Sequence, residues 1–225
     1  MREILKSLLL WVALVGVLAL ALGHGKPPNV LGLFIVSGLA VGSLYALGGI
    51  GLVVLYRATG VLNLAAGAIG AVAVMVAWQL VQWGIFAPLA WVMGLALGPM
   101  LATAYGRTLA SRMAWREPVV KAVASLGFAF VLLGLVSFLW SDDPRKFELP
   151  TDKAAVMLLG LRVTVTRLVV VGATIALVIG ISAALDSTRI GLQMRALANN
   201  RRLSSLIVIP ITRVETLAWA LSGLI

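Results

Sequence analysis

The chain has 225 residues, of which 61% are hydrophobic and 12% are charged, and its formal net charge is +10. Soluble domains average about 45–50% apolar and about 25% charged residues, so this composition excludes a soluble globular protein and predicts a polytopic membrane protein. The cations are dispersed between apolar segments without an aromatic-studded basic surface, so no nucleic-acid partner is expected. The absence of cysteine excludes disulfides and thiolate metal sites.

The first apolar run extends from Ser7 to Gly23 and follows the cations Arg2 and Lys6. It is close to the minimum length of about 17 residues for a membrane crossing. The basic start and the sequence Ala19-Leu20-Ala21 also fit a signal peptide with an A-x-A cleavage site. A retained first helix and a cleaved leader both stay open, and neither choice changes the later topology.

The later apolar runs predict further membrane crossings. They are a run of Val30 to Tyr56, a long run of Ala58 to Gly106 that fits two helices and a hairpin near Gln82 to Pro88, a run of Ala122 to Ser141, and a run of Leu168 to Leu185. A last helix is expected to begin near Thr212. The sequence therefore predicts an all-α membrane helical bundle with about six complete transmembrane helices and the start of a seventh.

The second and third helices carry the candidate packing and pathway residues. Gly38 and Gly42 form a GxxxG pattern, which predicts close packing against a neighbouring helix. Hydroxyls facing lipid would waste their hydrogen-bonding capacity, so Ser43 and Tyr45 are expected to face the bundle or the translocation pathway. Asn63 is expected to cap the third helix by accepting an N–H bond, with a pathway role as the alternative.

A basic polar island extends from Asp186 to Gly223, between two apolar segments. Leu203, Leu206 and Ile207 fall at helical i, i+3, i+4 spacing, and the other helical directions carry Arg201, Arg202, Ser204 and Ser205. Pro210 is expected to end this helix. The pattern predicts a short amphipathic helix that docks into a groove on another protein. A helix lying on anionic lipid headgroups is the alternative.

Orientation follows from the distribution of lysine and arginine. Placing the N-terminus and the loops at Arg107 and Asp186 on one side gives that side 12 of the 18 cations, namely Arg2, Lys6, Arg57, Arg107, Arg112, Arg116, Lys121, Arg189, Arg195, Arg201, Arg202 and Arg213. The positive-inside rule makes this side cytoplasmic. The island is then cytoplasmic, and the polar segment from Asp142 to Arg167 is periplasmic.

Motifs for catalysis are absent from the sequence. Lys26 follows a glycine but precedes Pro27, so there is no G-x-x-x-x-G-K-[ST] phosphate-binding loop, and any ATP is expected to be hydrolysed by another subunit. His24 is the single histidine, which offers neither a metal cluster nor a nucleophile pair, so no metal and no cofactor are expected. No charge is expected deep in a span, which argues against an ion-coupled carrier.

Three stretches resemble the branched-chain amino acid ABC permease family. The run GLQMRALANNRRLSSLIVIPITRVETLAWALSGL resembles its cytoplasmic coupling loop, GLAVGSLYALGGIGLVVLYRATGVLNLAAGAIG resembles its early helix pair, and AYGRTLASRMAWREPVVKAVASLG resembles the intervening loop and helix. The sequence departs from the family at Ala66, where a histidine is frequent, and at Val208 to Pro210, where a Gly-Ile-Asn run is frequent.

The resemblance implies a permease subunit of an ABC importer in the bacterial inner membrane, with a cytoplasmic N-terminus if the first helix is retained. It implies a branched-chain or related hydrophobic amino acid as substrate, with amides, urea or sugars as alternatives. The implied partners are a second homologous permease subunit, two ATP-binding subunits and a periplasmic binding protein, within membrane lipid. The residues implied in coupling to the ATPase are Arg195, Arg201, Arg202, Leu203, Leu206 and Ile207.

Two further expectations follow from the sequence. A small channel or membrane scaffold without ATPase coupling is the alternative from another class. Thr216 to Ile225 supplies about 15 Å of helix at about 1.5 Å per residue, half of an approximately 30 Å hydrocarbon core. We therefore expect residues 1–225 to form one permease domain that is incomplete at its C-terminus.

Overall fold

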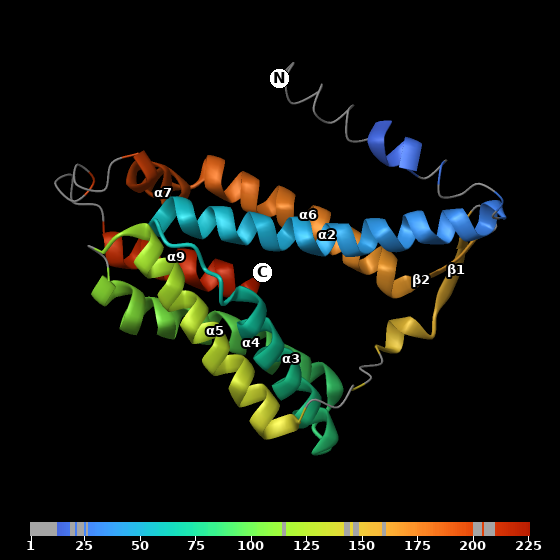
Figure 1. Ribbon diagram of the computed structural model, residues 1–225, viewed down its shortest axis with the longest axis horizontal. Helices are drawn as coiled ribbons and strands as arrows, with labels where there is room; N and C mark the ends of the chain where they lie inside the picture. The colour runs from blue at the N-terminus through green and yellow to red at the C-terminus, as the bar shows by residue number, and fades with distance from the viewer. Residues whose placement is uncertain are drawn as a thin grey trace. The chain divides into compact units, whose positions relative to one another are not determined.

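The computed structural model describes residues 13–18, 21, 25, 27–113, 116–141, 145, 149–158, 161–199, 204 and 210–225. These residues are largely helical, with a short pair of strands, as Figure 1 shows. The chain divides into two compact units, one of Met1–Leu44 with Glu148–Thr174 and one of Tyr45–Phe147 with Ile175–Ile225. Helices α2 (Pro28–Thr59) and α6 (Val165–Ser187) each contribute one half to each unit.

Four of the described helices are long and apolar enough to cross a membrane. They are α2, α4 (Ala87–Tyr105) with the turns that follow it, α5 (Pro118–Trp140) and α6. Helix α3 (Ala66–Gln82) is equally apolar and has 17 residues. Large apolar side chains are exposed along these helices, as expected for surfaces whose solvent is lipid. The all-α membrane bundle predicted from the sequence is confirmed, and residues 13–18 of the first apolar run are helical.

The unit that contains the start of α2 also holds a β-hairpin. Strands β1 (Ala155–Leu158) and β2 (Leu161–Thr164) are antiparallel, with Ala155 opposite Thr164. Val163 is fully buried while its neighbour Arg162 is exposed, which is the alternation of a strand with one covered face. The sequence predicted only a polar segment here, from Asp142 to Arg167. The β-branched run before α6 was the available signal.

The larger unit is centred on α3, α4, α5 and α9 (Ile211–Leu224). The chain reverses between α3 and α4 at Gly84, whose φ is +84°, a conformation that favours glycine. At the other end of α4, the ring of Tyr105 stacks on Phe128, with centroids 4.8 Å apart, and meets Trp219 edge-on at 5.2 Å. These aromatic contacts join α4, α5 and α9 into one core.

Glycine allows α4 to approach both of its neighbours closely. A Cβ added at Gly94 would lie 2.7 Å from the Cβ of Ala77 on α3. A Cβ added at Gly98 would collide with the backbone carbonyl oxygen of Gly223 on α9. Such contacts between small residues are typical of helix packing in membranes, where close van der Waals contact replaces the hydrophobic driving force.

The non-helical connection between α4 and α5 is shorter than the basic loop of Arg107 to Lys121 that the sequence predicted. Helix α4 continues into a π-helical turn, Gly106–Ala110 (η1), and a 3-10 turn, Ser111–Met113 (η2). Helix α5 begins at Pro118, because proline is well suited to a first helical position. Lys121, expected in the loop, therefore lies inside α5 and is only 7% exposed.

Candidate functional site

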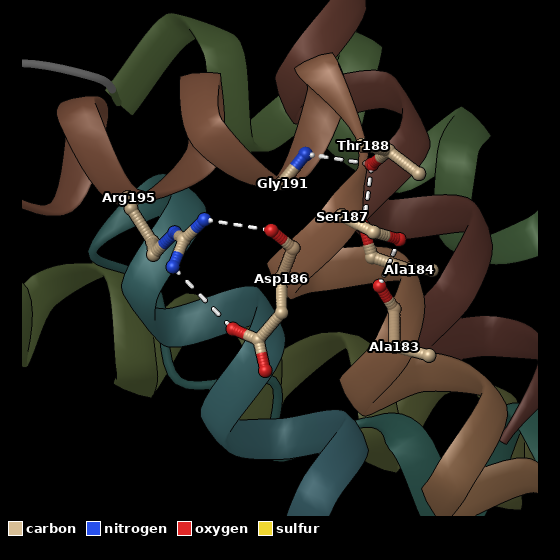
Figure 2. A network of polar contacts seen from close by, with 7 residues as sticks. All are labelled: Ala183, Ala184, Asp186, Ser187, Thr188, Gly191 and Arg195. Atoms are coloured by element: carbon tan, nitrogen blue, oxygen red, sulfur yellow. Dashed lines mark hydrogen bonds and ion pairs between the residues drawn. The ribbon is translucent and has the colours of Figure 1, made fainter.

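Helices α6 and α7 (Arg189–Asn199) meet at a tightly bonded corner, which Figure 2 shows. The hydroxyl of Thr188 accepts the backbone N–H of Gly191 at 3.1 Å and donates to the carbonyl oxygen of Ala184 at 2.5 Å. Ser187 makes the equivalent bond to the carbonyl of Ala183 at 2.5 Å. The Thr188 hydroxyl thus caps the start of α7 by accepting an N–H that has no partner within that helix. The Ala184 carbonyl also accepts the N–H of Thr188 at 3.1 Å.

Gly191 leaves no space for a side chain at this corner. A Cβ added there would collide with the backbone of Leu185, including its carbonyl oxygen. Because the obstacle is backbone and not a flexible side chain, a larger residue requires α7 to move away from α6. The sequence pattern around Gly191 does not indicate this close approach, which depends on how α7 turns against α6.

An ion pair links the two helices at the same corner. The guanidinium of Arg195 lies 3.3 Å from a carboxylate oxygen of Asp186 and donates a second bond of 3.3 Å to the Asp186 carbonyl (Figure 2). The side chains are 50% and 71% exposed, respectively, so the pair contributes only about 0–1 kcal/mol. A carboxylate is unfavourable at a helix C-terminus, and its pairing with Arg195 offsets this cost.

Helix α7 is amphipathic within the described residues. Gly191, Met194 and Leu197 recur every three residues and are buried, and this face packs near α9. Arg189, Leu192 and Arg195 are exposed. The exposed side therefore combines an apolar side chain with two cations. It offers a contact surface outside the long apolar helices.

Most of the predicted coupling residues lie outside the described part of the chain, namely Arg201, Arg202, Leu203, Leu206 and Ile207. Their roles stay predictions, and Arg195 is the one member whose position is described. Ser204 is described as helical and buried, although the amphipathic pattern had assigned it to the polar directions. Helical spacing determines which side chains share a face, but contacts with the rest of the chain determine which face is covered.

A second cluster of polar contacts holds the non-helical connection between α2 and α3. Helix α2 ends at Thr59 and is followed by Gly60, which has a φ of +67° and donates its N–H to the carbonyl of Tyr56 at 2.7 Å. The carboxamide oxygen of Asn63 accepts the N–H of Ala65 at 3.1 Å, next to the start of α3. Asn63 thus accepts an N–H, but it does not cap α3 as predicted, because the N-cap residue is Ala65 and no side chain caps it.

Helices α5 and α9 complete this cluster. The hydroxyl of Ser125 on α5 accepts the N–H of Leu64 at 3.1 Å and lies 2.9 Å from the carbonyl oxygen of Leu62. The amide nitrogen of Asn63 donates to the hydroxyl of Ser222 on α9 at 3.1 Å. Asn63, Ser125 and Ser222 are all buried. Backbone outside a helix is tolerated in a membrane protein only where such partners satisfy it.

The other predicted residues of α2 lie on surfaces that the described chain leaves open. Tyr45 is 79% exposed. Ser43 donates its hydroxyl to the carbonyl of Ala40 in its own helix at 2.7 Å. A Cβ added at Gly38 or Gly42 would meet no described atom within 4 Å. Helix packing at the two glycines and a pathway role for the hydroxyls stay predictions.

Residues 34–225 match the family described as the branched-chain amino acid transport system, permease component. The chain belongs to this family. No curated protein and no solved structure matches it. The permease is thus a multi-pass membrane protein and a transport component, and the match includes both the α6–α7 corner and the polar cluster around Asn63.

Proposed function

We propose that the permease is the membrane-spanning subunit of an ABC importer that moves branched-chain or related hydrophobic amino acids across a bacterial inner membrane. Two partner subunits would bind and hydrolyse the ATP. A second homologous permease subunit would share the translocation pathway, and a periplasmic binding protein would deliver the substrate. Residues 142–167 would receive that protein, and residues 186–213 would contact the ATPase.

The observation that carries this proposal is the joint between α6 and α7. Helix α7 is short, carries exposed cations, and is fixed to α6 by the Thr188 bonds, the Asp186–Arg195 pair and the close approach at Gly191. A force on α7 would therefore reach α6, a helix long enough to cross the membrane. Such a joint suits the transfer of ATPase movement into the membrane domain.

The polar cluster around Asn63 supports a role in the same movement. Ser222 lies on α9, which follows the proposed ATPase contact in the chain, and it is bonded to the connection before α3. A displacement of α9 would therefore act on the start of α3. Movement at the cytoplasmic loop would in this way reach the interior of the bundle.

Gly191→Ala tests the proposal in cells that express the complete importer. Gly180→Ala is the matched control, because Gly180 also lies near the end of α6 and a Cβ there meets no described atom within 4 Å. We expect Gly191→Ala to reduce both leucine uptake and co-purification of the ATPase, and Gly180→Ala to preserve both. Normal leucine uptake and normal ATPase co-purification with Gly191→Ala would contradict the proposed role of the α6–α7 joint in coupling.

A second experiment separates the importer from a channel or scaffold. Leu203→Glu combined with Leu206→Glu should release the ATPase from the detergent-solubilised complex, because charges replace the predicted apolar contact. The unchanged permease should retain the ATPase. Failure of the unchanged permease to recover any ATPase would favour a channel or scaffold. Uptake of urea or a sugar in place of leucine would support an ABC importer with a different substrate.

A further inference from the structure

A cavity of about 540 Å³ lies between the second half of α2, the second half of α6 and the middle of α7. Its walls are largely apolar, with Ile50 and Val53 on α2 and Val178 and Ile181 on α6. The volume lies within the range of about 300–1,000 Å³ that is usual for small-molecule sites. It is therefore large enough to hold an apolar ligand.

The charged groups of the cavity gather at one end. Arg57 lies in the last turn of α2, Asp186 lies near the end of α6, and Arg195 reaches the cavity from α7. Arg195 is paired with Asp186 at 3.3 Å, whereas no described residue forms an ion pair with Arg57. Two cations and one carboxylate leave one excess positive charge, so a ligand group with a single negative charge would neutralise this end.

The length of the cavity identifies its occupant. From Ala46 to Arg57 the lining of α2 rises about 16 Å at about 1.5 Å per residue, close to half of the approximately 30 Å hydrocarbon core. An acyl chain of one leaflet covers this depth, and a small zwitterionic solute does not. Both main walls belong to helices that are apolar enough to cross the membrane.

We propose that this cavity binds an anionic glycerophospholipid. One acyl chain lies between α2 and α6, and the phosphodiester contacts Arg57 and Arg195. Basic pockets between transmembrane helices are a recognised way to hold anionic headgroups. The lipid would join α7 to the end of α2, because its phosphate contacts a cation on each. This site does not depend on the transported substrate or on the ATPase.

The test measures lipid retention in permease reconstituted with an equal mixture of phosphatidylglycerol and phosphatidylcholine. The protein is purified again in mild detergent, and its retained lipid is measured by mass spectrometry. We expect phosphatidylglycerol to be enriched over phosphatidylcholine. Arg57→Gln should reduce its retention about fivefold, as expected for removal of one cation beside an anionic headgroup. The exposed Arg112, which lies outside the cavity lining, supplies the control Arg112→Gln.

A second pair of variants tests the apolar part of the cavity. Gly49 lines the cavity and Gly48 does not, and a Cβ at either position meets no described atom within 4 Å. Gly49→Phe should fill the cavity and reduce lipid retention, whereas Gly48→Phe should leave the cavity open and retention unchanged. Equal retention of the two lipids, or unchanged retention in both Arg57→Gln and Gly49→Phe, would overturn the proposal. So would a disulfide between Gly49→Cys and a cysteine on a second permease subunit, because a helix would then occupy the groove.

Discussion

The side-chain amide of Asn63 donates a 3.1 Å hydrogen bond to the hydroxyl of Ser222, and both residues are buried. This bond joins the connection before α3 to α9, between residues that are 159 positions apart in the sequence. Asn63 also accepts the N–H of Ala65. One side chain therefore satisfies local backbone and a distant helix at the same time.

Asn63→Ala should destabilise the permease by about 1–3 kcal/mol, because it leaves buried polar groups unpaired. Ser222→Ala should cost less, near the average of about 0.6 kcal/mol for interhelical bonds in membranes. Thermal unfolding in lipid nanodiscs measures both changes, and the double variant should cost less than the two changes added. Ser43→Ala is the control, since among the described residues its hydroxyl bonds only within α2. Strict additivity would show that the two side chains do not interact.

Gly98→Ala should separate α4 from α9. A Cβ at Gly98 collides with the carbonyl oxygen of Gly223, and overpacking of this kind costs about 1–3 kcal/mol. Gly134→Ala on α5 should be tolerated, because a Cβ there meets no described atom within 4 Å. The thermal midpoints of the two variants give the comparison. Equal midpoints would mean that the helices do not approach this closely.

Tyr105→Phe should leave stability unchanged or raise it. The hydroxyl of Tyr105 is buried and has no hydrogen-bond partner among the described residues, so its removal abolishes a desolvation cost. The ring contacts with Phe128 and Trp219 do not require the hydroxyl. Tyr105→Leu should be destabilising because it loses these contacts. A clear loss of stability in Tyr105→Phe would show that the hydroxyl has a partner.

The segment before β1 should loosen in acid. Bonds from the Thr166 hydroxyl and the Leu149 N–H lower the pKa of Asp152 below its ordinary value of 3.8. A lowered folded-state pKa adds stability that is present above the ordinary value and is lost as pH falls through the folded-state pKa. The protection of residues 149–158 against hydrogen exchange, relative to an unstructured peptide at the same pH, should fall in that acid range. Asp152→Asn should remove most of this pH dependence, and an unchanged dependence would assign it to another group.

Membrane orientation can be tested with two new cysteines, because the chain has none of its own. Lys153 and Arg189 are both exposed. We expect Lys153→Cys to react with an impermeant maleimide in intact spheroplasts, and Arg189→Cys to react only after the membrane is disrupted. The reverse pattern would invert the proposed topology.

Sequence reasoning was most reliable where a single segment determines its own structure. Uncharged runs located α2, α4, α5 and α6, and Pro210 marked the start of α9. The distribution of charges predicted that Lys121 lies in a loop. It lies in α5 instead, because this helix begins earlier, at Pro118. The hairpin of β1 and β2 was missed, since a short strand pair gives a much weaker pattern than a membrane helix.

The candidate site was less predictable because it depends on contacts between distant segments. Asn63 was expected to accept an N–H as the cap of α3, whereas it accepts the N–H of Ala65 just before the helix. Its bond to Ser222 could not be predicted without knowing where α9 lies. The need for glycine at Gly191 likewise appears only when α7 turns back against Leu185. Arg195 was predicted through family resemblance, and its partner Asp186 was not.

The connection from Gly60 to Ala65 has a mechanical consequence. Its backbone is held by a few side-chain bonds, whereas α2 and α3 on either side are held by continuous helical hydrogen bonds. A change of angle between α2 and α3 can therefore occur by exchanging those few bonds, with both helices intact. The connection has the properties of a hinge, in which a few residues between rigid elements absorb the rotation. Ser125 on α5 and Ser222 on α9 are bonded to this connection, so a movement of either helix would act on it directly.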